Sequence, residues 1–256
     1  MPYRKPMESG TRLTLAAVTD IGLTRSVNED GFVVAQSHAT NWPPEAHVTI
    51  TLHEPVLVAV LDGTGGEEVW SIAARGALQA FWNDPMRRLH GLVAAAHAPL
   101  WRRSATPGER GAGAAATFVI LDRDKADWAQ VGDTRAYRLR QGFLERVTPE
   151  HSLLEEMLKS GMLTPASAAD FPHWSVLTRA LGVTENVEPS IGSTDLERGD
   201  RLLVCSDGIS GELDDRMIAR LLGEHDEPGE ACRALVDAAN RAGGRDNMTA
   251  MVAAID

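Results

Sequence analysis

Short runs of apolar residues, bounded by glycine and polar turns, recur along the chain and predict most of its strands. The clearest run is 56–61, which is almost unbroken and is typical of a strand buried on both faces. Gln141 and Gly142 stand between two further runs and predict a hairpin turn. Strands are predicted over 13–18, 31–35, 56–61, 117–122, 128–131, 135–140, 144–147, 201–205 and 249–255.

The predicted strands gather toward the two ends of the chain, and longer stretches of helical character lie between them. Helices are predicted over 68–81, 89–102, 153–160 and 228–242. A shorter one is predicted over 214–222, where the acidic start suits a helix N-terminus. This distribution indicates the α+β class. The segment 39–54, with paired prolines and Trp42, breaks the pattern, and we expect a surface hairpin or loop there.

The charge balance narrows the range of partners. The 256 residues carry a formal net charge of −11, which argues against a nucleic-acid partner because phosphate backbones require a basic footprint. A layered chain of this length can fold as one unit. We therefore expect a single domain over 1–256 that is monomeric, with residues 1–11 forming a flexible N-terminal segment.

Neither the cysteines nor the hydropathy indicates export or membrane insertion. Cys205 and Cys232 are the only cysteines, and they fit buried thiols in a reducing compartment better than a disulfide framework. No apolar run approaches the roughly 18 residues of a transmembrane helix, and residues 1–11 lack the core of a signal peptide. We expect a cytoplasmic protein with no direct membrane insertion.

Acidic residues flank several apolar runs in short polar or glycine-marked clusters. Asp62 ends the run 56–61 with an Asp-Gly pair, Asp207 ends the run 201–205 in the same way, and Asp246 stands before the closing run. Carboxylate and carbonyl oxygens are the ligands that hard cations such as Mg²⁺ and Mn²⁺ prefer. A metal-assisted hydrolase is the first hypothesis, although an isolated Asp-Gly after a strand is more often only a turn.

Two further clusters add to this interpretation. Arg25 precedes Glu29 and Asp30 by a few positions, and the planar guanidinium of arginine matches phosphate oxygens. Taken alone, an arginine beside Glu29 and Asp30 is more often a solvated ion pair that contributes roughly 0 to 1 kcal/mol. Asp133 follows a Val-Gly pair and is equally explained as the corner of a hairpin. The coincidence of all these clusters in this order favours metal ions beside a phosphate clamp.

These motifs carry a resemblance to a known family. The chain resembles the metal-dependent protein phosphatases of the PP2C (PPM) family, in their compact bacterial form, from about Leu13 to Ile255. The matching segments are 19–22 with Arg25 and 28–30, then 62–66, 131–137, 150–153, 177–182, 205–208 and 246–249. The resemblance implies a four-layer αββα sandwich, in which two central, mostly antiparallel sheets are flanked by helices.

The resemblance also implies that the acidic residues are metal ligands. The implied set is Glu29, Asp30, Asp62, Gly63 through its carbonyl oxygen, Asp133, Asp207 and Asp246. Asp62 would bridge two tightly held Mn²⁺ or Mg²⁺ ions, and Glu29 and Asp30 would reach their ion directly or through water. Asp133, together with Asp207, matches the position that helps hold a third, weaker ion in bacterial relatives.

The implied catalytic set is Arg25, Asp62, Asp207 and Asp246. In the implied reaction, a hydroxide that bridges the two ions attacks the phosphorus of phosphoserine or phosphothreonine. Arg25 and the ions would absorb the charge on the phosphoryl oxygens. Asn247 is expected to orient Asp246 or a metal-bound water.

Three classes of function are consistent with these motifs. The expected one is a protein serine/threonine phosphatase that acts on proteins phosphorylated by a bacterial-type kinase. The alternatives are a catalytically silent metal-binding scaffold and a hydrolase of small phosphate esters. Metal-dependent release of phosphate from a phosphopeptide separates the expected function from the scaffold, and a comparison with sugar phosphates separates it from the small-ester hydrolase.

The chain departs from the family beside the expected metals. After Gly66 it continues directly toward a helix, so we expect a shortened loop there. The stretch 163–174 corresponds to the family's flap beside the active site, where His173 and Trp174 either pack against the body or contact the substrate. His151 is expected to cap a helix or form hydrogen bonds, and not to bind a metal.

Overall fold

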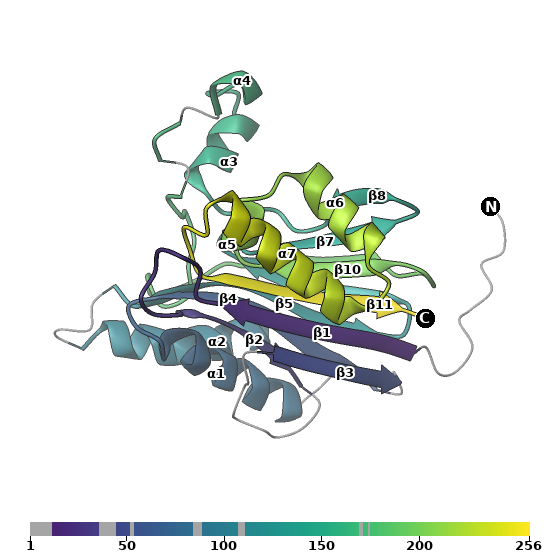
Figure 1. The fold of residues 1–256 in the computed structure, drawn as a ribbon. Helices are drawn as coiled ribbons and strands as arrows, with labels where there is room; N and C mark the ends of the chain where they lie inside the picture. Colours follow the sequence, from purple (N-terminus) through teal and green to yellow (C-terminus); the bar gives the residue numbers. More distant parts are fainter. Residues whose placement is uncertain are drawn as a thin grey trace.

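The fold is a sandwich of two antiparallel sheets with helices on both outer faces (Figure 1). The computed structural model describes residues 12–35, 54–83, 89–106, 111–168, 171–173 and 175–256, and the backbone of 45–51. Helices α6 and α7 cover one sheet, and α1 and α2 cover the other (Figure 1). The four-layer α+β architecture implied by the sequence resemblance is confirmed.

The first sheet has six strands in the order β3-β1-β11-β10-β7-β8. Its strands are β1 (Arg12–Asp20), β3 (Glu45–Thr51), β7 (Arg135–Arg140), β8 (Phe143–Arg146), β10 (Arg201–Cys205) and β11 (Met248–Ile255). The helices associated with it are α5 (Asp207–Ser210), α6 (Asp215–Glu224) and α7 (Pro228–Ala242). Because β10 and β11 are neighbours, the segments that carry Asp207 and Asp246 are brought to the same end of this sheet.

The second sheet has five strands in the order β2-β4-β5-β6-β9. Its strands are β2 (Asp30–Val34), β4 (Val56–Thr64), β5 (Gly113–Asp122), β6 (Lys125–Val131) and β9 (Ser190–Asp195). Helices α1 (Val69–Asn83) and α2 (Leu89–Ser104) pack on its outer face. In the β2–β4 register Asp30 lies directly opposite Asp62, so two acidic residues meet at one end of this sheet.

The position of strand β4, which is covered on both faces, explains why its apolar run is unbroken. Leu57, Ala59 and Leu61 face the helices α1 and α2, whereas the alternate residues Val58 and Val60 face the other sheet. Alternation places successive side chains on opposite faces of a strand, and both faces of this strand are covered. A strand in this position cannot show the polar-apolar alternation of a half-exposed strand.

Two edge strands depart from the sequence predictions. The segment 39–54 was expected to be a hairpin or loop, but 45–51 forms β3 and pairs with β1, so the prediction is wrong there. The pattern that favours a strand here is the alternation of Ala46, Val48 and Ile50 with polar residues. The adjacent prolines obscured this pattern. Residues 39–44 and 52–53 lie outside the described part of the chain, as do 1–11. Strand β9 was not predicted because Ile191 is its only large apolar residue.

Two local predictions are confirmed. The turn between β7 and β8 is formed by Gln141 and Gly142, whose φ angles of 51° and 80° are those of the two-residue turn that suits a twisted hairpin. Cys205 and Cys232 are both buried and are not joined in a disulfide. Within the described residues, no helix combines the length and the apolar character that crossing a membrane requires.

The expected flap forms a small helical projection. Helices α3 (Leu153–Lys159) and α4 (Pro165–Ala168) extend away from the sandwich at one end (Figure 1). His173 is exposed and its ring lies edge-on to Phe171, with 5.9 Å between the ring centroids. Trp174 lies outside the described residues, so its two expected roles stay open.

Helices α1 and α2 pack closely at Gly76, a residue that has no side chain. A Cβ atom at this position would lie 2.2 Å from the carbonyl oxygen of Ala95. We predict that Gly76→Ala lowers the free energy of unfolding by about 1–3 kcal/mol, because the overpacking outweighs the gain of about 1 kcal/mol in helix propensity. Urea denaturation measures the change.

Gly223 provides the matched control, since it also lies in a helix but nothing stands within 4 Å of a Cβ there. Gly223→Ala should leave the stability unchanged or raise it by up to about 1 kcal/mol. A Gly76→Ala protein that is as stable as Gly223→Ala would contradict the close-packing interpretation.

Candidate active site

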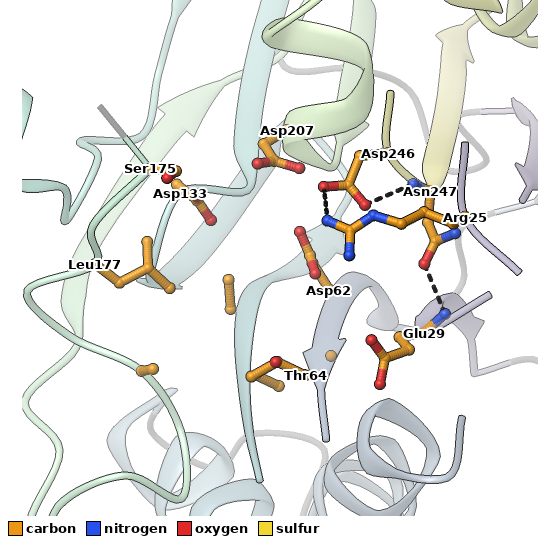
Figure 2. Close-up of a pocket in the computed structure, with 14 residues that line it drawn as sticks. Arg25, Glu29, Asp62, Thr64, Asp133, Ser175, Leu177, Asp207, Asp246 and Asn247 are labelled. Atoms are coloured by element: carbon orange, nitrogen blue, oxygen red, sulfur yellow. Dashed lines mark hydrogen bonds and ion pairs between the residues drawn. The ribbon is translucent and has the colours of Figure 1, made fainter. Parts of the chain in front are cut away.

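A cavity of about 270 Å³ opens where the two sheets present the turns that carry the acidic residues. Asp62, Asp133, Asp207 and Asp246 all line it, together with Arg25 and Glu29 (Figure 2). These side chains come from the end of β4, the β6–β7 turn, the start of α5, the turn before β11 and the β1–β2 loop. The structure therefore brings together residues that are spread over most of the chain.

Burial raises the pKa values of three carboxylates in the cavity, and neighbouring negative charges raise them further. For Asp62 the main cause is burial, followed by the charges of Asp30 and Asp207. For Asp133 it is again burial, followed by Asp207 and Glu150. The pKa of Asp207 is raised in the same way by burial and by Asp246. These three groups are therefore hard to ionise together, and a cation placed among them would be attracted by all of them.

One oxygen of this cluster has no hydrogen-bond partner in the protein. Oδ1 of Asp207 is buried and unpartnered, and leaving a buried acceptor unsatisfied costs about 1–3 kcal/mol or more for a charged group. Among the described residues, no three Asp, Glu, His or Cys side chains meet closely enough to hold one metal ion. The acidic side chains line one cavity without forming such a cluster.

Arg25 lies at the mouth of the cavity and pairs with Asp246. Its guanidinium is 2.6 Å from Oδ2 of Asp246, and the side chain of Arg25 remains 51% exposed (Figure 2). The hydrogen bond to Asp246 is also the main reason why the pKa of Arg25 is raised. The partner of this arginine is thus a residue far along the chain, and not the adjacent Glu29 or Asp30 that the solvated-pair interpretation proposed.

Glu29 is held against the glycine-rich turn that follows Asp62. Its carboxylate accepts a hydrogen bond of 2.5 Å from the backbone N–H of Gly66, and its carbonyl oxygen accepts one of 3.0 Å from Gly63. A Cβ on Gly63 would lie 2.8 Å from that carbonyl oxygen, so only glycine allows this approach. As expected, the turn is short, since α1 begins at Val69.

The side chain of Asn247 makes no hydrogen bond to the carboxylate of Asp246, which was one of its two expected roles, and the other role, orienting a metal-bound water, stays a prediction. Only the backbone N–H of Asn247 reaches that carboxylate, at 2.8 Å. The side-chain oxygen accepts from the N–H of Glu29, and the side-chain nitrogen donates to the carbonyl oxygens of Ile21 and Val27. Asn247 therefore holds the shape of the β1–β2 loop, which carries both Glu29 and Arg25.

The turn that presents Asp133 rests on a buried polar network. Gly132 has a φ angle of 95°, a backbone conformation that favours glycine. Gln130 donates to the carbonyl oxygen of Gly132, while Thr117 contacts both Gln130 and Thr134. Gln130, Thr117 and Thr134 are fully buried. The network fixes the direction in which Asp133 enters the cavity. A residue that served only as the corner of a hairpin would not need this support.

His151 supports the same turn, as its expected hydrogen-bonding role required. Its Nδ1 accepts from the N–H of Gly132 at 3.3 Å, and its Nε2 lies 2.8 Å from the hydroxyl of Ser190. Burial lowers the pKa of His151 to about 4, so that the ring is neutral near pH 7 and can accept a hydrogen bond. The helix cap beside it is Ser152, whose hydroxyl accepts from the N–H of Glu155.

The comparisons with known proteins agree with this geometry. A crystal structure of the Mycobacterium tuberculosis serine/threonine phosphatase PstP/Ppp superposes with a TM-score of 0.77 at 30% sequence identity. That similarity covers 96% of this chain and 99% of the other. The chain belongs to the PPM family of serine/threonine phosphatases. The family model described as "Stage II sporulation protein E (SpoIIE)" matches residues 162–256.

Further structures and sequences of related phosphatases show similar agreement. A structure of the PstP catalytic domain in complex with two manganese ions has a TM-score of 0.74 at 29% identity, over 96% of this chain and 99% of that one. Protein phosphatase PhpP of Streptococcus pneumoniae is 26% identical over 93% of this chain and 95% of its own length. The curated PstP sequence is 29% identical over 94% of this chain, but the match spans only 45% of PstP.

Of the acidic residues expected at the metals of a PPM phosphatase, Asp30 is the one that does not line the cavity. It is 3% exposed and lies behind Asp62, and one of its oxygens accepts a hydrogen bond of 2.6 Å from Ser206. Ser206 also accepts from the N–H of Thr249. Sequence reasoning assigned no role to Ser206, although its hydroxyl stands directly before the Asp-Gly pair of Asp207.

Asp30 gives a prediction for the pH dependence of stability. Burial raises its pKa to about 7 in the folded protein, so between about pH 4 and 7 the folded state holds a proton that the unfolded chain has released. The stabilisation from this proton is therefore complete below about pH 4 and is lost as the pH rises through 7. Asp30→Asn removes this contribution while keeping an acceptor for Ser206.

The measurement is the difference in free energy of unfolding between Asp30→Asn and wild type, in a chelator, from pH 5 to 8. The variant should be favoured most at pH 8, and its advantage should shrink as the pH falls. His151 titrates with the opposite sign, but it is present in both proteins and cancels. A difference that does not change with pH would contradict the raised pKa.

Proposed function

We propose that this chain is a metal-dependent protein phosphatase that hydrolyses phosphoserine and phosphothreonine. The observation that carries the proposal is the convergence of five carboxylates and one guanidinium on a single cavity (Figure 2). Membership of the PPM family supports it, as do the names of the relatives. The proposal includes that 1–256 acts as one catalytic domain and as a monomer.

The donor set of the cavity fits hard divalent cations. The acidic side chains that line the cavity offer only oxygen atoms as metal ligands. One oxygen of Asp207 lacks a hydrogen-bond partner, and the carboxylates repel one another. The residues that would hold two Mn²⁺ or Mg²⁺ ions are Glu29, Asp62, Gly63 through its carbonyl, Asp207 and Asp246, with Asp30 behind them. Asp133 and Asp207 would hold a third, weaker ion. When bound, such ions supply a water of lowered pKa as the nucleophile.

Electrostatics sets the order of binding. A phosphate group is doubly charged near neutral pH and would be repelled by the five neighbouring carboxylates. Divalent cations held by these carboxylates would reverse the sign of the local field and so allow the cavity to accept phosphate. They would also compete with Arg25 for the carboxylate of Asp246.

Arg25 is placed to bind the phosphate group. An exposed ion pair such as its contact with Asp246 contributes roughly 0 to 1 kcal/mol, so exchanging that partner costs little. Its planar fork of donors can bind two phosphoryl oxygens at once. The rest of the loop stays in place, because Asn247 holds it through three hydrogen bonds to its backbone.

The substrates proposed are proteins phosphorylated by a bacterial-type serine/threonine kinase. A catalytically silent scaffold would bind metal without turnover, and a small-ester hydrolase would prefer sugar phosphates to phosphopeptides. Release of inorganic phosphate from these two substrate classes, with Mn²⁺ and with a chelator, distinguishes the three functions.

Asp62→Asn tests the function and the central ligand together. The substitution keeps the shape of the side chain but removes the charge that would attract two ions. We predict that Mn²⁺ binding at two sites is lost in calorimetric titration and that phosphopeptide turnover falls by at least about 100-fold, since the nucleophile depends on that pair. The exposed Asp226 provides the matched control as Asp226→Asn. Unchanged two-site binding in the Asp62 variant would contradict the assignment.

Arg25→Ala tests the phosphate clamp. We predict that kcat/KM for a phosphopeptide falls by about tenfold or more, because a bidentate charged contact is lost in the ground and transition states. Arg25→Lys should restore only part of it. Mn²⁺ affinity should stay the same or become tighter, since Asp246 is freed from its partner. Wild-type kinetics, or a loss explained entirely by weaker Mn²⁺ binding, would refute the clamp.

A further inference from the structure

A second hollow adjoins the candidate active site. It measures about 390 Å³ and is formed mainly by the segment 177–188, which links the flap to β9. Thr64, Leu177 and Ala180 line both this groove and the active-site cavity. The two spaces are therefore contiguous, and one polypeptide can occupy both. We call the hollow the 177–188 groove.

The wall of this groove is anchored to the same strands as the active site. Leu181 exchanges two backbone hydrogen bonds with Ala114, of 2.8 and 3.1 Å. The N–H of Gly182 donates to Nδ1 of the buried His97 at 3.1 Å, and Nε2 of His97 lies 3.3 Å from the carbonyl oxygen of Glu185. The groove is thus a built part of the fold with a fixed position relative to Asp62.

The lining of the groove differs in character from that of the active-site cavity. Val183 is 54% exposed and lies over Gly113, while Leu177, Ala180 and Val187 add further apolar surface. The charged residues of the groove are one of each sign, Arg179 and Glu188, whereas four aspartates line the active-site cavity. An apolar side chain would gain about 25 cal/mol for each Å² of apolar surface that it buried here.

The near edge of the groove lies within reach of an extended peptide. Thr64, which lines both spaces, is two residues beyond Asp62 on β4, and this corresponds to roughly 7 Å along a strand. An extended chain advances about 3.3–3.6 Å per residue. When a phosphorylated side chain occupies the cavity, a side chain two or three positions away along the peptide therefore reaches the groove.

We propose that the 177–188 groove binds an apolar side chain of the phosphoprotein substrate, two or three residues from the phosphorylated one. This inference rests on the proposed phosphatase function and adds a sequence preference to it. Contiguity with the cavity identifies the occupant as the substrate segment beside the phosphate. The apolar lining identifies its chemistry.

The test uses the Mn²⁺-loaded protein and three kinds of substrate. One is a set of phosphoserine peptides with leucine placed in turn at each of the three positions on either side. The second is the same peptide with serine at all of these positions, and the third is p-nitrophenyl phosphate, which is too short to reach the groove. Val183→Asp alters the groove, and Phe143→Asp makes the same kind of change at a 73% exposed residue on β8.

The wild type should turn over at least one leucine peptide, with leucine two or three positions from the phosphoserine, about tenfold faster in kcat/KM than the serine peptide. A difference of this size is within the range of an apolar contact. Val183→Asp should abolish the preference while turnover of p-nitrophenyl phosphate stays within about twofold, and Phe143→Asp should retain it. A wild type without any preference, or a preference unchanged by Val183→Asp, would overturn the groove assignment. A wild type that hydrolyses none of the three substrates would instead overturn the proposed function.

Discussion

Repulsion between the buried carboxylates of Asp62, Asp133 and Asp207 is the constraint on which the rest of the site depends. Burial raises the pKa of each of these groups, and the charge of Asp207 adds to the rise at both Asp62 and Asp133. A buried ionised carboxylate must be matched by a proton, a hydrogen-bond donor or a cation, because leaving it unmatched costs far more than any surface interaction contributes. Few hydrogen-bond donors lie within reach, and one oxygen of Asp207 accepts no hydrogen bond. Divalent cations would compensate these negative charges and would also allow the cavity to bind phosphate.

The surrounding structure holds the repelling groups together. Asp62 is carried by the second sheet and Asp207 by the end of β10 in the first, so the packing between the sheets opposes their separation. Gln130 and Thr117 brace the turn of Asp133 from inside the fold. Asn247 does the same for the loop of Arg25. These contacts are neutral hydrogen bonds worth about 1 kcal/mol each, so rigidity comes from their number and burial.

The sequence predicted those features that depend on local pattern. The buried run of β4, the Gln141–Gly142 turn and the Asp-Gly clusters each have a short-range cause, and all were found. Edge strands such as β3 were missed, because their polar residues weaken the local signal and their pairing partner decides the outcome. Partners far apart in the chain were also not predictable. The pairing of Arg25 with Asp246 and the hydrogen bond from Ser206 to Asp30 both depend on how the sheets meet.

The central claim is that these carboxylates form one divalent-cation centre. Crystals of the wild type soaked in Mn²⁺ test it most directly, through an anomalous difference map collected near the manganese absorption edge. The account predicts two strong peaks in the cavity, with a carboxylate oxygen of Asp62 in contact with both and with Asp207 and Asp246 in contact with one of them. A map with no peak in the cavity, or with manganese only at surface carboxylates elsewhere, would contradict it.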